Sequence, residues 1–183
     1  MRKLLASLTV GIIITAGIAE AKNMIPEKKG ITFCTESGQN EINPTGVGFR
    51  GWHANGLGIQ LVYKTSQNED LSSSWKNEQS YFEGLALFTT TNVGTHSNVF
   101  VGIGIATEEK NTHSVYGHVS SDFSVSRAST VCELGSEISL TSTGNVRFLG
   151  ELGYRRAFLQ KSGGYFNTPG NTIFTRMGIG LYF

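Results

Sequence analysis

His118, Ser120 and Asp122 come closest in this sequence to the residue types and spacing of a catalytic site. A serine hydroxyl becomes a nucleophile when a histidine takes its proton and a carboxylate orients that histidine. The three residues alternate along the chain, so in a β-strand their side chains share one face. Residues at i and i+2 are about 7 Å apart there, too far for a direct hydrogen bond between short side chains. The spacing therefore favours a polar strand face, and catalysis by His118, Ser120 and Asp122 is the alternative.

A larger set of charged residues alternates with apolar residues along several segments. The charged residues on the non-apolar parity are Arg50, Lys64, Glu133, Glu137, Arg147, Glu151, Arg155 and Arg176. In strands these side chains lie on the face opposite to the apolar one. If that face is enclosed, the charges must pair, because an unpaired buried charge is costly. The pattern predicts a network of cation–carboxylate pairs inside the fold.

Other chemistry has less support in the sequence. The four histidines (His53, His96, His113 and His118) lack the spacing of a zinc site. Gly102-Ile103-Gly104 lacks the third glycine and the helix of a dinucleotide site. We therefore expect no metal, no cofactor and no enzymatic activity.

Cys34 and Cys132 are the only cysteines. They have opposite facing parities, on segments that are not neighbours in an eight-stranded closure. A disulfide requires Cα atoms within about 7 Å of one another. The two residues can therefore pair only if loops or a bulge bring them together, and the sequence leaves this open.

Strands must position these residues, and eight segments alternate in the way that strands do. They are residues 29–35, 45–52, 57–65, 80–91, 98–108, 131–140, 145–157 and 172–183. Most have about the 9–11 residues that cross a bilayer at a tilt. Asn55-Gly56 between the second and third segments is a strong signal for a tight hairpin. The facing of residues 80–91 is ambiguous, because Glu83 shares its parity with Leu85 and Leu87.

The connections between the segments alternate in length. The long ones are 36–44, 66–79, 109–130 and 158–171, and the short ones are 53–56, 92–97 and 141–144. Bacterial membrane barrels have short periplasmic turns and longer outer loops. Residues 115–126 also alternate, and we interpret 109–130 as an external hairpin arm that continues the fifth and sixth strands. The sequence predicts an all-β fold, an eight-stranded antiparallel up-and-down transmembrane β-barrel, with ten strands as the alternative.

The start of the chain has the pattern of an export signal. Arg2 and Lys3 precede an apolar region of fifteen residues, Leu4 to Ile18, and Ala19-Glu20-Ala21 is a small-residue cleavage site. The pattern predicts a signal peptide over residues 1–21 and a barrel domain over 22–183. Without the signal the chain has 13 basic and 13 acidic residues, so charge gives no support for a nucleic-acid partner.

The end of the chain is its most regular strand. Met177, Ile179, Leu181 and Phe183 share one parity, and Arg176 lies on the other with glycines. The closing strand of an outer-membrane barrel has this pattern, with apolar side chains toward lipid and aromatic residues at the interface.

These features resemble the OmpA/OmpX-type small outer-membrane barrels, in particular the signal, the eight strands, the alternating connections and the terminal Leu181-Tyr182-Phe183. The stretch Phe49-Arg-Gly-Trp-His-Ala-Asn-Gly-Leu-Gly-Ile59 is similar to the strand–turn–strand unit of that superfamily. The resemblance implies that outer-membrane lipid surrounds the apolar face. It also implies that the barrel-assembly machinery reads Met177, Ile179, Leu181 and Phe183.

The resemblance and the predicted interior together suggest a role. An eight-stranded barrel is just wide enough for side chains to fill it, so we expect a plugged lumen and a structural role or a surface ligand bound through the loops. A narrow, porin-like channel is one alternative. The other is a lipid A-modifying enzyme, since outer-membrane lipid A deacylases have a His-x-Ser motif like His118 and Ser120. In those enzymes an Asn follows the serine, and here Ser121 takes its place.

Overall fold

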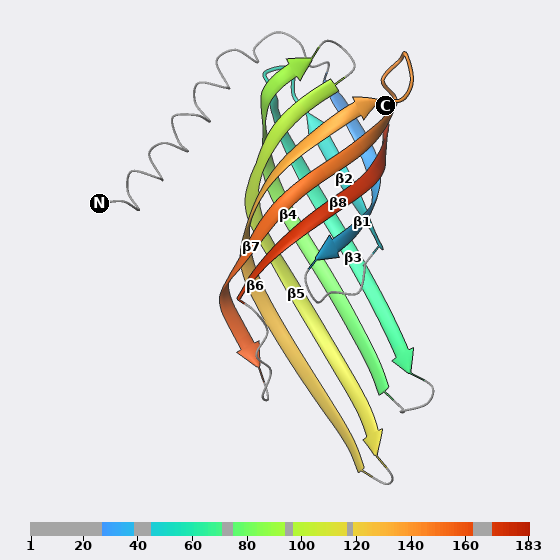
Figure 1. Cartoon of the computed structure of the whole chain (residues 1–183), viewed down its shortest axis with the longest axis vertical. Helices are drawn as coiled ribbons and strands as arrows, with labels where there is room; N and C mark the ends of the chain where they lie inside the picture. The colour runs from blue at the N-terminus through green and yellow to red at the C-terminus, as the bar shows by residue number, and fades with distance from the viewer. Residues whose placement is uncertain (1–26, 39–44, 71–74, 94–96, 117–118, 163–169) are drawn as a thin grey trace, which may run out of the picture.

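The computed structural model of the chain shows one closed β-barrel (Figure 1). It describes residues 27–38, 45–70, 75–93, 97–116, 119–162 and 170–183. The strands are β1 (Lys28–Gly38), β2 (Thr45–Trp52), β3 (Leu57–Asp70), β4 (Trp75–Val93), β5 (Ser97–Tyr116), β6 (Val119–Ser139), β7 (Val146–Ser162) and β8 (Asn171–Tyr182). Each strand pairs antiparallel with the next, and β8 closes the barrel on β1 from Gly30↔Tyr182 to Gly38↔Phe174. The prediction of eight antiparallel up-and-down strands is confirmed.

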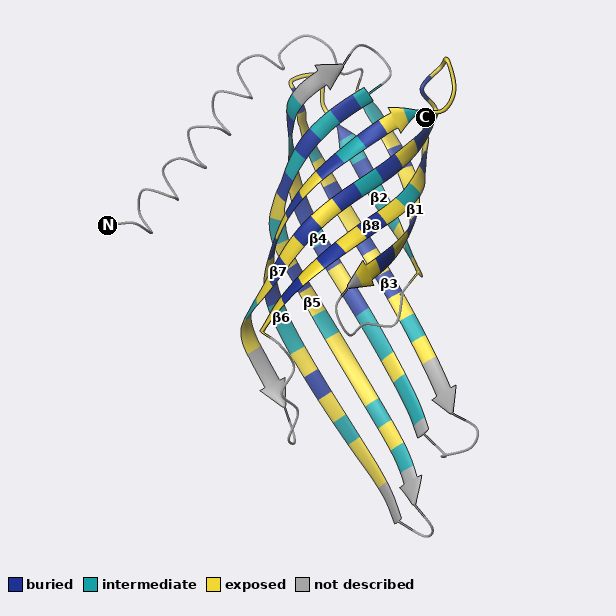
Figure 2. Ribbon diagram, in the orientation of Figure 1, coloured by how far each residue is buried: buried dark blue, intermediate teal, exposed yellow. Residues whose placement is uncertain are grey.

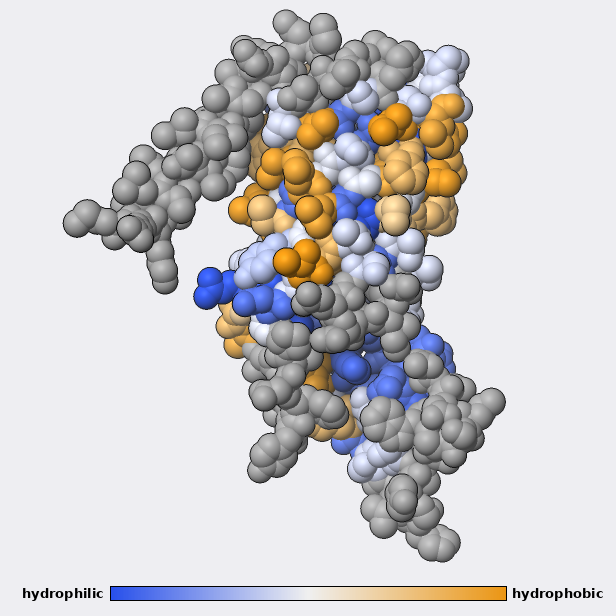
Figure 3. Space-filling model, viewed as in Figure 1, coloured by the Kyte–Doolittle hydropathy of each residue, from blue (hydrophilic) through white to orange (hydrophobic). Residues whose placement is uncertain are grey.

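Alternation along the strands separates two kinds of surface. Buried and exposed residues follow one another along the barrel strands (Figure 2). Ile59, Ile105, Leu152 and Met177 are among more than twenty large apolar side chains that point outward and are exposed. In Figure 3 most of the visible apolar surface lies over the barrel, while hydrophilic surface lies toward the long hairpins. An apolar surface of this extent marks contact with a partner or a membrane.

The two ends of the barrel differ in strand length. β5 and β6 pair from Ser97↔Ile138 to Tyr116↔Val119 and extend far beyond the barrel, as do β3 and β4 (Figure 1). The predicted arm that continues the fifth and sixth strands is confirmed. The predicted long loop 66–79 is wrong, because β3 runs to Asp70 and β4 starts at Trp75. Backbone pairing with neighbours forms these strands although both faces are polar, so no apolar alternation marks them.

Two smaller expectations are also corrected. The first strand extends beyond the predicted residue 35 to Gly38. The last long connection is shorter than predicted, because β7 runs to Ser162 and β8 begins at Asn171.

The facing of β4 and of the cysteines is clear in the structure. Glu83, Leu85 and Leu87 all point into the lumen and are buried. Cys34 is buried inside, Cys132 is exposed outside, and both are free. Opposite faces of the barrel wall keep the two thiols apart. Within the described residues, no helix has the length and apolar character to cross a membrane.

Gly153 gives a test of the lumen packing. It is the register partner of Phe174, and a Cβ atom at Gly153 would overlap the Phe174 ring. Gly150, on the same strand, would place its Cβ no nearer than 3.8 Å to any atom. We predict that Gly153→Ala lowers the free energy of unfolding by about 1–3 kcal/mol through overpacking, and that Gly150→Ala changes it little. Urea unfolding in lipid bilayers measures both variants, and equal effects would contradict this packing.

Candidate functional site: the lumen charge network

Ten charged side chains are buried in the lumen, five cationic and five acidic. They are Glu36, Arg50, Lys64, Glu83, Glu133, Glu137, Arg147, Glu151, Arg155 and Arg176. All eight residues that the sequence placed in an interior network lie here. Their charges are balanced once Glu36 and Glu83 are included.

Arg176 in β8 is the centre of the network. Its Nη2 lies 2.7 Å from Glu83 and 3.1 Å from Glu36, and its Nη1 lies 2.8 Å from Glu151 and 3.3 Å from Glu133. Glu36 and Glu151 are also its register partners on the two neighbouring strands, β1 and β7. Arg176 therefore joins two adjacent strands and reaches β4 and β6 across the lumen.

A second group of contacts surrounds Glu137, toward the short-turn end. One carboxylate oxygen accepts bonds from Arg50 (2.7 Å), Trp52 Nε1 (3.1 Å) and the Tyr182 hydroxyl (2.6 Å). The other accepts from Arg147 at 2.7 Å. Both oxygens of this carboxylate are therefore hydrogen-bonded, and its four neighbours come from β2, β7 and β8.

A third group lies toward the hairpin end. Glu36 binds Lys64 and also Arg155, at 2.6 Å. The Arg155 guanidinium lies 4.4 Å from the ring centre of Tyr81 and 4.1 Å from that of Phe174. Cations over aromatic faces are stabilised further when they are removed from water. These groups fill the lumen where the barrel continues into the hairpins.

Glu36 and Glu83 are the members that sequence reasoning missed. Glu36 follows the predicted end of the first strand, and Glu83 shares its parity with lumen leucines. A signal for them was present, because the predicted set has five cations and only three carboxylates. An enclosed interior cannot hold two unpaired positive charges, so two acidic residues had to be sought on the same faces.

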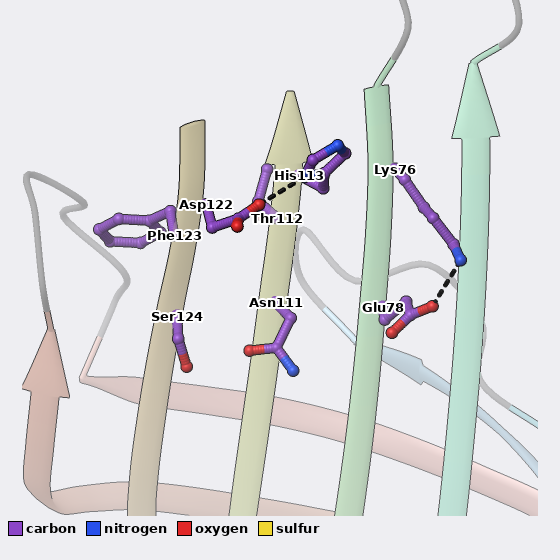
Figure 4. Close-up of a pocket in the computed structure, with 8 residues that line it drawn as sticks. All are labelled: Lys76, Glu78, Asn111, Thr112, His113, Asp122, Phe123 and Ser124. Atoms are coloured by element: carbon purple, nitrogen blue, oxygen red, sulfur yellow. Dashed lines mark hydrogen bonds and ion pairs between the residues drawn. The ribbon is translucent and has the colours of Figure 1, made fainter. Parts of the chain in front are cut away.

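The candidate triad is only partly within the described structure. His118 lies outside the described residues, and Ser120 lies in β6 without a described side chain. Asp122 binds Nδ1 of His113, its register partner on β5 (Figure 4). The carboxylate is thus bound to a histidine that the sequence reasoning did not consider for this role.

Asp122 and His113 border an open pocket on the long hairpins. It has a volume of about 490 Å³ and is lined by Lys76, Glu78, Asn111, Thr112, His113, Asp122, Phe123 and Ser124. Figure 4 shows Lys76 turned toward Glu78, to which it is bound at 2.8 Å, and away from His113. Among the residues that the structure describes, no three His, Cys, Asp or Glu side chains are grouped to hold a metal ion.

The four residues of the expected assembly signal lie at the end of β8. Met177, Ile179 and Leu181 point outward into the apolar surface, and Phe183 is 79% exposed. The backbone of Phe183 exchanges hydrogen bonds with Lys29 at 2.9 and 3.4 Å. The last residue is therefore fixed to β1 while its side chain remains outside.

Comparison with known proteins identifies the fold. No family model and no curated protein matches the sequence. A major outer membrane protein of Thermus thermophilus aligns with a TM-score of 0.63 and 14% identity, covering 87% of this chain and 100% of the other. The N-terminal β-barrel domain of Pseudomonas aeruginosa OprF aligns with a TM-score of 0.58 and 12% identity, covering 85% and 97%.

Ail of Yersinia pestis, solved in complex with the heparin analogue sucrose octasulfate, is also similar. Its TM-score is 0.58 at 13% identity, covering 87% of this chain and 100% of Ail. At these identities the likeness establishes the fold. The chain has the fold of the small outer-membrane β-barrels, as its resemblance to the OmpA/OmpX type implied.

Arg176 gives the test of the network. Arg176→Met leaves four buried carboxylates without their shared cation, so we predict a loss of about 3–5 kcal/mol in the free energy of unfolding. Arg156→Met is the matched control, because Arg156 is an exposed arginine on the neighbouring strand β7, and it should leave stability unchanged. Urea titration in lipid bilayers measures both, and equal stabilities of the two variants would contradict the central role of Arg176.

Proposed function

We propose that the protein is an integral outer-membrane β-barrel with a closed lumen and a surface-directed hairpin arm. The apolar outer surface and the charged interior support membrane insertion, since lipid-facing and lumen-facing residues alternate in such barrels. In this proposal the predicted signal peptide, residues 1–21, directs export and is removed. The assembly machinery then reads the exposed residues Met177, Ile179, Leu181 and Phe183.

The contact that best supports a closed lumen crosses the barrel. Arg176 on β8 binds Glu83 on β4, four strands away around the wall, at 2.7 Å. Arg50 on β2 likewise binds Glu137 on β6 at 2.7 Å. Such bridges occupy the diameter of the lumen. The buried charges also balance, whereas a selective pore is lined by rings of one sign. The narrow channel is therefore the less favoured function.

The hairpin arm supports the surface role. The pairing of β6 with β7 ends at Val125↔Ser162, and that of β2 with β3 ends at Thr45↔Thr65. Within the described residues, 119–124 of β6 and 66–70 of β3 are thus paired on one side only, with β5 and β4, and their other side is a strand edge. Unpaired edges present backbone donors and acceptors to which an extended segment of a ligand can add.

The net charge of the two long hairpins, β3–β4 and β5–β6, limits the class of surface ligand. Residues 66–80 and 107–128 contain six acidic and three basic residues. A sulfated polyanion of the kind bound to Ail is disfavoured by this charge, so we propose a neutral or basic partner. We further propose that the arm is not an enzyme. Among the described residues no hydroxyl is bonded to the His113–Asp122 pair, and the neighbouring Ser121 hydroxyl is bonded to that of Ser114, at 2.7 Å.

If the lumen is closed, the protein should not conduct ions. Purified protein reconstituted into planar bilayers should give no conductance steps, under conditions in which a general porin conducts. Glu137→Gln is the variant for comparison, because it removes one negative charge from the proposed plug and would change the ion selectivity of any conducting lumen. Regular steps from the wild-type protein, with an ion selectivity that changes in Glu137→Gln, would contradict the plug and establish the channel.

The proposed orientation predicts which segments antibodies reach on intact cells. An epitope inserted between Tyr116 and Val119 should be accessible, because the arm projects outward. The same epitope inserted in the turn His53–Gly56 should be accessible only after the outer membrane is opened. Labelling of both on intact cells, or of the turn alone, would overturn this orientation.

A further inference from the structure

The short-turn end of the lumen contains buried polar groups that differ from the charge network. Both side-chain polar atoms of Asn98, the Thr89 hydroxyl and the Ser139 hydroxyl are buried and have no hydrogen-bond partner among the described residues. Asn98 is 2% exposed and Thr89 is 1% exposed. They are neutral, so they do not take part in the charge balance described above.

Thr89 and Ser139 each lie diagonal to Asn98 on the lumen face, on the two strands that flank β5. The register partner of Asn98 on β6 is Glu137, and Ser139 is two residues further along the same face. Thr89 on β4 is opposite Phe100, the next lumen residue after Asn98 on β5. Diagonal neighbours on one sheet face are roughly 7–8 Å apart. A β-bulge between Thr89 and Thr91 interrupts the pairing beside them.

The carboxylate opposite Asn98 on β6 already has several partners. The carboxylate of Glu137 is already bound by two arginines, Trp52 and Tyr182. Above Thr89 and Asn98, the fully buried side chains of Leu87 and Phe100 separate them from the centre of the network. Phe100 contacts Trp52 edge-to-face, with 5.5 Å between ring centres, which extends this apolar layer.

We propose that Asn98, Thr89 and Ser139 form an internal water-binding site at the short-turn end of the lumen. An amide offers two donors and an acceptor, and each hydroxyl offers a donor and acceptors. Water is the one small ligand that can complement both sets at once, and buried waters typically bind polar groups that are otherwise unsatisfied. In this proposal ordered water lies at the short-turn end of the lumen beside Glu137, and Leu87 and Phe100 lie between it and the Arg176 centre of the network.

Gln60 provides a matched internal control. It carries the same primary amide and is 1% exposed, but it lies in the charge network, where its Nε2 lies 3.4 Å from Glu133. In the folded protein in lipid nanodiscs, NMR magnetisation transfer from water should give cross peaks to the side-chain amide protons of Asn98 and none to those of Gln60. Asn98→Leu should remove the transfer seen at this site.

The other outcomes of this experiment oppose the proposal. A folded protein with no water cross peak at Asn98 would show that the groups are unsatisfied or are bonded elsewhere. Cross peaks at both amides would show that water fills the whole lumen, and would remove the distinction between the two ends. Since only wild-type protein is needed for the comparison, failure of a variant to fold cannot obscure the result.

Discussion

The pairing of buried charge is the constraint on which the rest of this structure depends. Ten ionisable side chains are removed from water in the lumen, and charges buried there without partners would strongly destabilise the barrel. Arg176 meets most of this requirement, because four of the five buried carboxylates contact it. Its register partners are Glu36 and Glu151, so the same residue lies at the seam where β8 closes the barrel on β1. A slip of one residue would turn Arg176 to the apolar outer face, and the charge network therefore fixes the register of closure.

Other features of the molecule follow from that constraint. The cations lie over Tyr81, Phe174 and Phe100, so aromatic faces complete contacts that the carboxylates leave open. These rings need space, which Gly135 and Gly153 provide by lacking a side chain. With polar groups directed inward, the outer face can be apolar throughout the barrel. Beyond the barrel the constraint ends, and residues 66–70 of β3 are polar on both faces.

Periodicity made much of this fold predictable. Period-two alternation located all eight strands and the inward facing of residues such as Arg50 and Arg155. The alternation did not reveal strands that are polar on both faces, or the facing of apolar residues that point into the lumen. Residues 66–70 are strand without an apolar face, and Leu85 and Leu87 are apolar residues that face a lumen. Glu36 was missed because the polar end of its strand shows no alternation. Glu83 was missed because it shares its parity with apolar residues that face the lumen.

The sequence alone could not predict which carboxylate pairs with which cation. Which carboxylates meet Arg176 depends on barrel closure and on contacts across the lumen, and neither is expressed in local spacing. The i, i+4 spacing of Arg147, Glu151 and Arg155 places all three on one face, yet their partners lie on other strands. Arg147 binds Glu137 on β6, 10 residues away, whereas Arg155 binds Glu36 on β1, 119 residues away.

The most direct test of the central claim, a lumen sealed by paired charge, uses the two native thiols. Cys34 points into the lumen beside the network, and Cys132 points outward on the apolar face. In Cys132→Ala protein reconstituted into lipid vesicles, a small, charged, water-soluble thiol reagent should leave Cys34 unmodified until urea unfolds the barrel. Rapid modification of Cys34 in the folded barrel would show that water and ions enter the lumen at the network, and would contradict the account.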